Sequence, residues 1–123
     1  RVLKVSKMIE QGEFDLEALR KMGYEEAKGK LMFLPGVGHK VADCVLLFSL
    51  DMLEAFPVDV WMRRIILRFY PDHFEPSFVE KVLGKRSITP KEYEKINTFG
   101  RGYFGEYAGY VQEYLFHYWR IKP

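Results

Sequence analysis

Lys40 stands where an amine can act as a nucleophile. It follows the loop Leu34–Gly38 and lies in the first turn of an expected helix of small and apolar residues. The positive end of a helix dipole and apolar surroundings both disfavour an ammonium ion, so both favour the neutral amine. A neutral amine attacks a carbon such as a sugar C1′ and forms a Schiff base. The alternative is a lysine that pairs with a phosphate.

Asp59 ends the run Phe56–Asp59 and stands at the expected N-cap of the next helix. Backbone N–H groups at a helix N-terminus keep a carboxylate ionised and fixed in place. An ionised carboxylate beside a sugar that develops oxocarbenium character stabilises that charge. Taken alone, Asp59 is best explained as a capping residue, whose removal costs about 1 kcal/mol.

The loop before Lys40 has the composition of an anion-binding turn. Glycines at 36 and 38 permit positive φ angles and a close approach of another backbone. The free N–H groups of Gly36, Gly38 and His39 at the start of the following helix suit one phosphate. We therefore predict that the loop residues Gly36, Val37, Gly38 and His39 form a phosphate-binding site. An ordinary helix–helix turn is the alternative, which the neighbouring Leu34-Pro35 and Lys40 make less attractive.

Three further side chains have spacings that allow ligand contact. Cys44 lies one helical turn after Lys40, so the two residues share a face. Gln112 and Phe116 are four residues apart on the last expected helix. A glutamine amide reads the edge of a base, and a phenylalanine ring stacks on it. On chemistry alone Cys44 is better explained as a buried small hydrophobe, and the spacing of the other two permits a base contact without requiring one.

The elements that must position these side chains are helices. Apolar periodicity and capping residues predict helices over 2–10, 16–20, 24–33, 39–50, 60–69, 76–83, 90–99 and 104–120. Thr89-Pro90-Lys91-Glu92 is a capping box with proline at the first helical position. No segment alternates with period two. We therefore expect an all-α fold of about seven or eight helices that contains a helix-hairpin-helix motif.

Composition bounds the kind of protein. The 123 residues suit one domain over 1–123, with 48% hydrophobic and 29% charged residues. A net charge of +2 excludes a broad basic surface, so a nucleic-acid contact must be local and geometric. Cys44 is the only cysteine, which excludes an internal disulfide and a four-cysteine iron–sulfur or zinc site. The three histidines lack metal-ligand spacing, and no apolar run reaches membrane length.

These motifs resemble a known family. Leu34–Cys44, followed by Pro57-Val58-Asp59-Val60, is similar to the helix-hairpin-helix DNA glycosylase superfamily, above all its 8-oxoguanine glycosylase/lyase branch. Gly109–Gln112 with Leu115-Phe116 resembles the last helix of that branch. The similarity covers nearly the whole chain, and the Lys-to-Asp spacing is its most specific part.

The resemblance implies a base-excision repair enzyme that removes an oxidised purine from double-stranded DNA and nicks the strand. Lys40 would then be the nucleophile, and Asp59 the catalytic carboxylate. Cys44 and Phe116 would sandwich the extruded base, and Gln112 would read its Watson–Crick edge.

The resemblance also carries expectations about partners and cofactors. The hairpin would bind a phosphate of the DNA backbone, and in relatives a bound monovalent cation helps it to do so. We expect no other cofactor and no iron–sulfur cluster. We expect a monomer that acts in the prokaryotic cytoplasm (nucleoid) or in the eukaryotic nucleus. The branch often has a phosphate-contacting histidine two residues after the catalytic carboxylate, where this chain has Trp61. His39 likewise stands where relatives have a small polar residue.

Two other functions stay open on the sequence. A helix-hairpin-helix module that only binds DNA needs the glycines but not Lys40 and Asp59 at this spacing. The other alternative is a catalytically incomplete fragment that only folds. Family members begin with a sheet domain, and no counterpart of that domain is found in this sequence. We accordingly expect the chain to be the C-terminal part of a longer enzyme.

Overall fold

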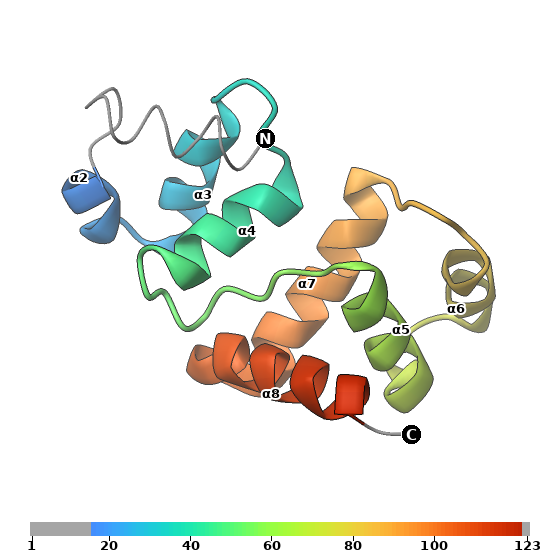
Figure 1. The fold of residues 1–123 in the computed structure, drawn as a ribbon. Coiled ribbons are helices and arrows are strands. Elements are labelled where there is room, and N and C mark those ends of the chain that lie inside the picture. Colours follow the sequence, from blue (N-terminus) through green and yellow to red (C-terminus); the bar gives the residue numbers. More distant parts are fainter. Residues whose placement is uncertain (1–15, 122–123) are drawn as a thin grey trace.

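The computed structural model describes residues 16–121 as helices and connecting loops (Figure 1). The α-helices are α2 (Leu16–Arg20), α3 (Tyr24–Met32), α4 (His39–Phe48), α5 (Val60–Phe69), α6 (Pro76–Leu83), α7 (Pro90–Phe104) and α8 (Ala108–Ile121). Two short 3-10 helices, η1 (Pro71–His73) and η2 (Gly105–Tyr107), join longer elements. The all-α prediction is confirmed for this part of the chain. The helix expected over 2–10 lies outside the described residues.

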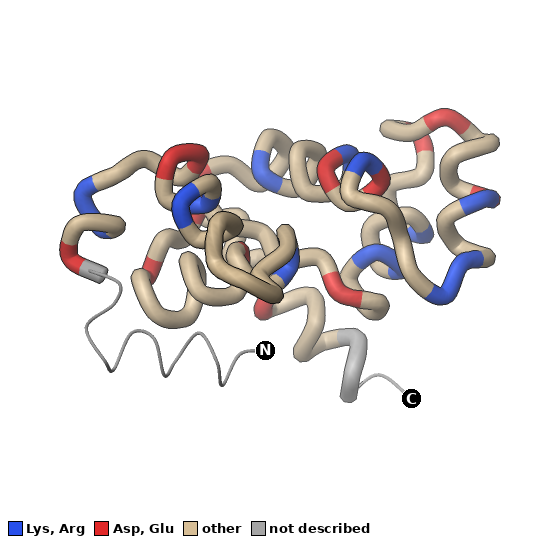
Figure 2. Tube along the Cα trace, turned by 90° about the horizontal axis from the view of Figure 1, so that it is seen from above, with Lys and Arg blue, Asp and Glu red and all other residues tan. Residues whose placement is uncertain are grey.

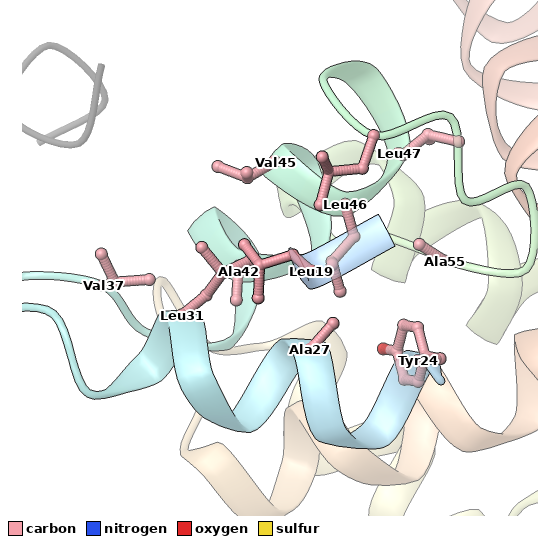
Figure 3. Packing of buried hydrophobic residues seen from close by; sticks show 11 residues of the cluster. Leu19, Tyr24, Ala27, Leu31, Val37, Ala42, Val45, Leu46, Leu47 and Ala55 are labelled. Atoms are coloured by element: carbon pink, nitrogen blue, oxygen red, sulfur yellow. The ribbon is translucent and has the colours of Figure 1, made fainter. Parts of the chain in front are cut away.

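The first of two cores is built by α2, α3 and α4. Apolar residues at helical spacing on α3 and α4 face each other, and α2 closes one side of them (Figure 3). Leu19, Leu31 and Leu46 contribute one fully buried leucine from each helix. Burying a leucine side chain stabilises a fold by about 1.5–3 kcal/mol, so these residues hold α4 firmly against α3.

The second core is built by the helices from α5 onward. Fully buried Ile66 of α5 and Ile96 of α7 pack there with Phe56, which precedes α5. In Figure 1, α5 and α6 lie on the side of the molecule away from α2 and α3, while α7 lies between the two sides and α8 runs along the lower edge. Residues 49–59 connect α4 to α5 without forming a helix and so pass from the first core to the second.

The ends of α7 combine a confirmed prediction with a wrong one. Thr89 and Glu92 form the predicted capping box at its start. The helix was expected to end near Phe99, but it continues through Gly100 to Phe104 and ends at Gly105, whose φ is +74°. Gly100 lies inside the helix, and the ring of Phe56 fills the space beside it, where a Cβ would lie 2.4 Å from that ring, so the position accommodates only glycine. Because α7 includes Phe104, α8 begins at Ala108 and not at residue 104.

Charge on the described surface is mixed. Lysine and arginine positions are interspersed with aspartate and glutamate along the trace, without a face of one sign (Figure 2). This distribution agrees with the sequence-based expectation that any nucleic-acid contact is local. Across residues 16–121 no helix combines the length and the apolar character that a bilayer crossing requires.

Candidate active site

The hairpin between α3 and α4 is a tight turn closed by its own backbone. Leu34 N–H donates to the Leu31 carbonyl at 3.0 Å, and Val37 N–H donates to the Leu34 carbonyl at 3.1 Å. Gly36 has the positive φ expected of it, +80°. Gly38 does not, because it is the extended N-cap of α4 with φ −100°. Gly38 thus does not use the positive φ that glycine permits, while its lack of a side chain leaves the start of α4 open.

Lys40 lies in the first turn of α4, as predicted. No side chain caps this helix at Gly38, so the N–H groups of its first turn are available to a ligand. The side chain of Lys40 is exposed, which corrects the expectation of apolar surroundings. The apolar residues of α4 turn toward α3 and the first core, and Lys40 lies on the opposite side. Among the described residues Lys40 has no ion-pair partner.

Asp59 is the N-cap of α5, as predicted. Its Oδ1 accepts a hydrogen bond from Met62 N–H at 2.7 Å. The side chain is partly buried, so one carboxylate oxygen is fixed by the helix while the group still borders solvent-accessible space. A carboxylate held in this way presents its charge in a defined direction without needing an ion pair.

All five side chains expected to contact the reacting nucleotide line one pocket of about 320 Å³. Lys40 and Cys44 reach it from α4, Asp59 from the start of α5, and Gln112 and Phe116 from α8. The complete lining is Lys40, Cys44, Phe48, Pro57, Asp59, Gln112, Glu113, Phe116 and His117. The pocket is therefore formed where α4, which belongs to the first core, meets the start of α5 and α8, which belong to the second core.

Comparisons with known proteins identify relatives of this chain. No protein-family model matches the chain. A probable N-glycosylase/DNA lyase of Methanothermobacter thermautotrophicus is 41% identical over 108 residues, which are 88% of this chain and 30% of that protein. The N-glycosylase/DNA lyase OGG1 of Arabidopsis thaliana is 39% identical and covers 82% of this chain and 25% of its own length.

A solved structure gives the same result for the fold. The Clostridium acetobutylicum 8-oxoguanine glycosylase/lyase, crystallised with double-stranded DNA containing cytosine opposite 8-oxoguanine, superposes with a TM-score of 0.68 at 35% identity. The match covers 93% of this chain and 34% of that one. The chain belongs to the helix-hairpin-helix DNA glycosylase superfamily. It spans about a third or less of the length of these relatives.

Within this glycosylase fold the thiol of Cys44 is uncharged. Burial raises its pKa; the positive charge of Lys40 lowers it, and the negative charges of Asp43 and Asp59 raise it again. The net shift is upward, so the thiol stays protonated at neutral pH. Cys44 therefore supplies a small, soft wall to the pocket and is a poor nucleophile beside Lys40.

Helix α8 forms part of the pocket's lining. Gln112 is buried, and its Nε2 donates to the Pro57 carbonyl at 3.2 Å. A primary amide has a second N–H and an oxygen, so this bond leaves further capacity for a ligand. Phe116 lies one turn later on the same face and is half-buried. The structure thus brings the two α8 residues and Cys44 to one pocket.

Sequence reasoning missed four residues of the pocket: Phe48, Pro57, Glu113 and His117. Phe48 lies one turn after Cys44 on α4, and its spacing alone would have identified it. Glu113 and His117 are four apart on α8 beside the predicted pair, so the same rule would have added them. Pro57 belongs to the motif Pro57-Val58-Asp59-Val60, but no contact with a ligand was expected of it.

Two positions differ from the expected glycosylase pattern, and each packs locally. The ring of His39 stacks on Tyr93 with centroids 5.3 Å apart. Burial, then the charge of Lys28, lowers the pKa of His39, so the ring is neutral at neutral pH. Trp61 is 45% exposed, and the guanidinium of Arg64 lies 5.4 Å from the centre of its ring.

The side chain of Val37 is buried in the first core and anchors the hairpin.

Proposed function

We propose that this chain forms the catalytic helix-hairpin-helix part of a DNA glycosylase with AP lyase activity, which removes 8-oxoguanine from double-stranded DNA. The observation that carries this proposal is the convergence of Lys40, Asp59, Cys44, Gln112 and Phe116 on one pocket. A module that only binds DNA has no need for an amine and a carboxylate in one pocket. The relatives whose names include this activity support the assignment.

The reaction follows from the two charged residues. The amine of Lys40 attacks C1′ of the damaged nucleotide, and the N-glycosidic bond breaks so that the base leaves with its bonding electrons and takes up the proton that the amine gives up. The Asp59 carboxylate stabilises the positive charge that develops on the sugar. Ring opening turns the amine adduct into a Schiff base. Loss of a proton from C2′ then expels the 3′ phosphate by β-elimination and nicks the strand.

The remaining pocket residues recognise the extruded base. A base taken out of the duplex must be held by stacking and by hydrogen bonds to its edge, which offset an unpairing cost of a few kcal/mol. Phe116 offers an aromatic face and Cys44 a small apolar one, so the base is bound between them. Gln112, oriented by the Pro57 carbonyl, reads the Watson–Crick edge with its free amide capacity.

The hairpin binds the DNA backbone. The first turn of α4 has no side-chain cap, and the glycines before it allow a phosphate oxygen to approach the N–H groups of Gly38 and His39. Phosphate contacts set position and carry no sequence information. The resemblance also implies a monovalent cation at the hairpin, for which backbone carbonyls are the fitting ligands because the loop is built of leucine, proline, glycine and valine. The cation, the absence of any other cofactor and the monomeric state stay predictions.

Excision assays on the complete gene product test the proposal. Under single-turnover conditions with an 8-oxoguanine duplex, we expect base release and strand cleavage by the wild type and neither by Lys40→Gln. Lys21→Gln is the matched control, because Lys21 is also exposed but does not line the pocket. Retained excision in Lys40→Gln would refute the mechanism. Binding without base release by the wild type would favour the DNA-binding module instead.

A further inference from the structure

A buried polar network lies beside the pocket. Asp43, three residues after Lys40 on α4, is completely buried. Its carboxylate accepts hydrogen bonds from the hydroxyl of Tyr24, from Lys28 Nζ at 3.0 Å, from Tyr93 Oη at 2.6 Å and from Asn97 Nδ2 at 3.3 Å. A buried carboxylate is strongly destabilising unless its oxygens are satisfied, so the arrangement of these donors is closely constrained.

Two of the donors also hold the backbone that leads to Asp59. Tyr93 Oη accepts a hydrogen bond from Val58 N–H at 3.2 Å. Asn97 Nδ2 donates to the Phe56 carbonyl at 2.9 Å. We call these residues, Phe56–Val58, the 56–58 segment. It is therefore held by the same two side chains that hold Asp43.

Tyr93 can bond in both directions because its hydroxyl keeps its proton. Burial, followed by the negative charge of Asp43, raises the pKa of Tyr93 well above its usual value. The proton is donated to Asp43, and the oxygen is left to accept from Val58 N–H. The two bonds share one oxygen, so moving either partner disturbs the other.

The network joins the two cores at the place where the reacting residues meet. Neighbours of Lys40 on α4, such as Ala42, are buried in the first core. Val58 and Met62, on either side of Asp59, are buried in the second core. Packing within either core alone does not set the distance between Lys40 and Asp59. The bonds from Asp43 to Tyr93 and Asn97 connect the two sides directly.

We propose that Asp43, Tyr93 and Asn97 are positioning residues that fix Asp59 relative to Lys40 through the 56–58 segment. This inference rests on the proposed function of Lys40 and Asp59. It makes Tyr93 different from Tyr24, whose hydroxyl bonds to the same carboxylate but comes from α3 and makes no bond to the 56–58 segment. Loss of either hydroxyl removes one bond from Asp43, while only the loss of the Tyr93 hydroxyl releases Val58 N–H.

The two half-reactions separate positioning from general stability. Excision of a base develops positive charge on the sugar, so it needs Asp59 close to C1′. A preformed abasic site already offers an aldehyde to the Lys40 amine, and no base has to leave. A misplaced Asp59 therefore slows excision and leaves nicking of abasic DNA largely unchanged. A partly unfolded enzyme loses both activities together.

The experiment compares Tyr93→Phe with Tyr24→Phe in the complete gene product. Single-turnover rates are measured on an 8-oxoguanine duplex and on a duplex with a preformed abasic site, beside melting temperatures and DNA dissociation constants. We expect Tyr93→Phe to slow excision by about 10- to 100-fold, the scale of a small misplacement of a reacting group, with abasic nicking and DNA affinity near the wild type. Tyr24→Phe should change excision by less than about threefold at a similar loss of melting temperature.

Asn97→Ala is measured in parallel, because Tyr93→Phe by itself can lower stability too far for assay. It releases the Phe56 carbonyl instead of Val58 N–H and should show the same selective loss of excision. Equal effects of Tyr93→Phe and Tyr24→Phe, or equal slowing of excision and nicking in Tyr93→Phe and Asn97→Ala, would overturn the inference. Lys40→Gln serves as the separate check on the proposed function, since activity retained there removes the mechanism itself and not only the positioning.

Discussion

Replacement of Asp59 by asparagine separates its contribution to folding from its contribution to chemistry. Asp59 Oδ1 accepts the Met62 N–H at 2.7 Å, and an asparagine oxygen in the same place can accept the same bond. Asparagine and aspartate are about equally good N-caps, so the free energy of unfolding should change by less than about 0.5 kcal/mol. Asp59→Ala removes the acceptor and should cost about 1 kcal/mol, or roughly 4 °C in melting temperature for a domain of this size.

The chemical effect should follow a different order. Both variants lose the charge that faces the developing sugar cation, so both should slow excision by about 10²- to 10³-fold, the scale seen when one preorganised electrostatic group is removed. In stability, the wild type and Asp59→Asn should be about equal, and both should exceed Asp59→Ala. In excision rate, the wild type should exceed both variants. The two rankings do not coincide, and this difference identifies a catalytic contribution.

The assay combines thermal unfolding with single-turnover excision on an 8-oxoguanine duplex, at enzyme concentrations that saturate the DNA. Saturation removes differences in binding from the measured rate. Near-normal excision by Asp59→Asn would refute the reasoning and reduce Asp59 to a helix cap. Unfolding of Asp59→Asn as severe as that of Asp59→Ala would refute the capping half of the argument.

Three further predictions follow from the described contacts. A Cβ at Gly38 would meet no atom within 4 Å and its φ is allowed, so Gly38→Ala should lose at most about 1 kcal/mol of stability. It should nevertheless weaken binding to damaged and undamaged duplex alike, as measured by titration. Gly36→Ala should weaken binding in the same way and should also strain the backbone by about 1 kcal/mol, because the φ of Gly36 is +80°. Selective loss for damaged DNA would contradict both.

Gly100→Ala places a Cβ 2.4 Å from the Phe56 ring and should destabilise the fold by about 1–3 kcal/mol in chemical denaturation; no loss would show that this ring can move.

Hydrogen bonds from Lys85 and from Thr89 N–H lower the pKa of Glu92 to about 2. Its stabilising contribution is therefore complete above the unfolded pKa of about 4.5 and is lost as the pH falls toward 2, so Glu92→Gln should flatten the pH dependence of stability between these values. An unchanged slope would contradict this pKa.

The pocket was predictable from sequence because its residues sit at helix ends and helical spacings. Gly36 and Lys40 mark a helix start, Asp59 marks another, and Gln112 and Phe116 lie one turn apart. Local rules of this kind place a side chain on an element without reference to the rest of the fold. The same rules failed at Gly100, because local signals do not show that the Phe56 ring packs against this glycine inside a continuing helix.

The Asp43 network was not predictable from the sequence. Its members come from three separate helices, α3, α4 and α7, and each is an ordinary residue in its own segment. Asp43 stands next to Cys44 in an apolar helix, and only the packing of α3 and α7 around α4 reveals that it is satisfied. The exposure of Lys40 was also missed, because apolar neighbours in sequence do not determine which side of a helix faces the core.

Identification of the residue that bonds to DNA tests the central claim most directly. The complete gene product is incubated with an 8-oxoguanine duplex in the presence of borohydride, which reduces a Schiff base to a stable amine. The adduct is then digested and the modified peptide sequenced by tandem mass spectrometry. We predict a single modified residue, Lys40, within the peptide that contains the hairpin. A trapped adduct at any other amine, or excision without any trapped adduct, would contradict the assignment of Lys40 as the nucleophile.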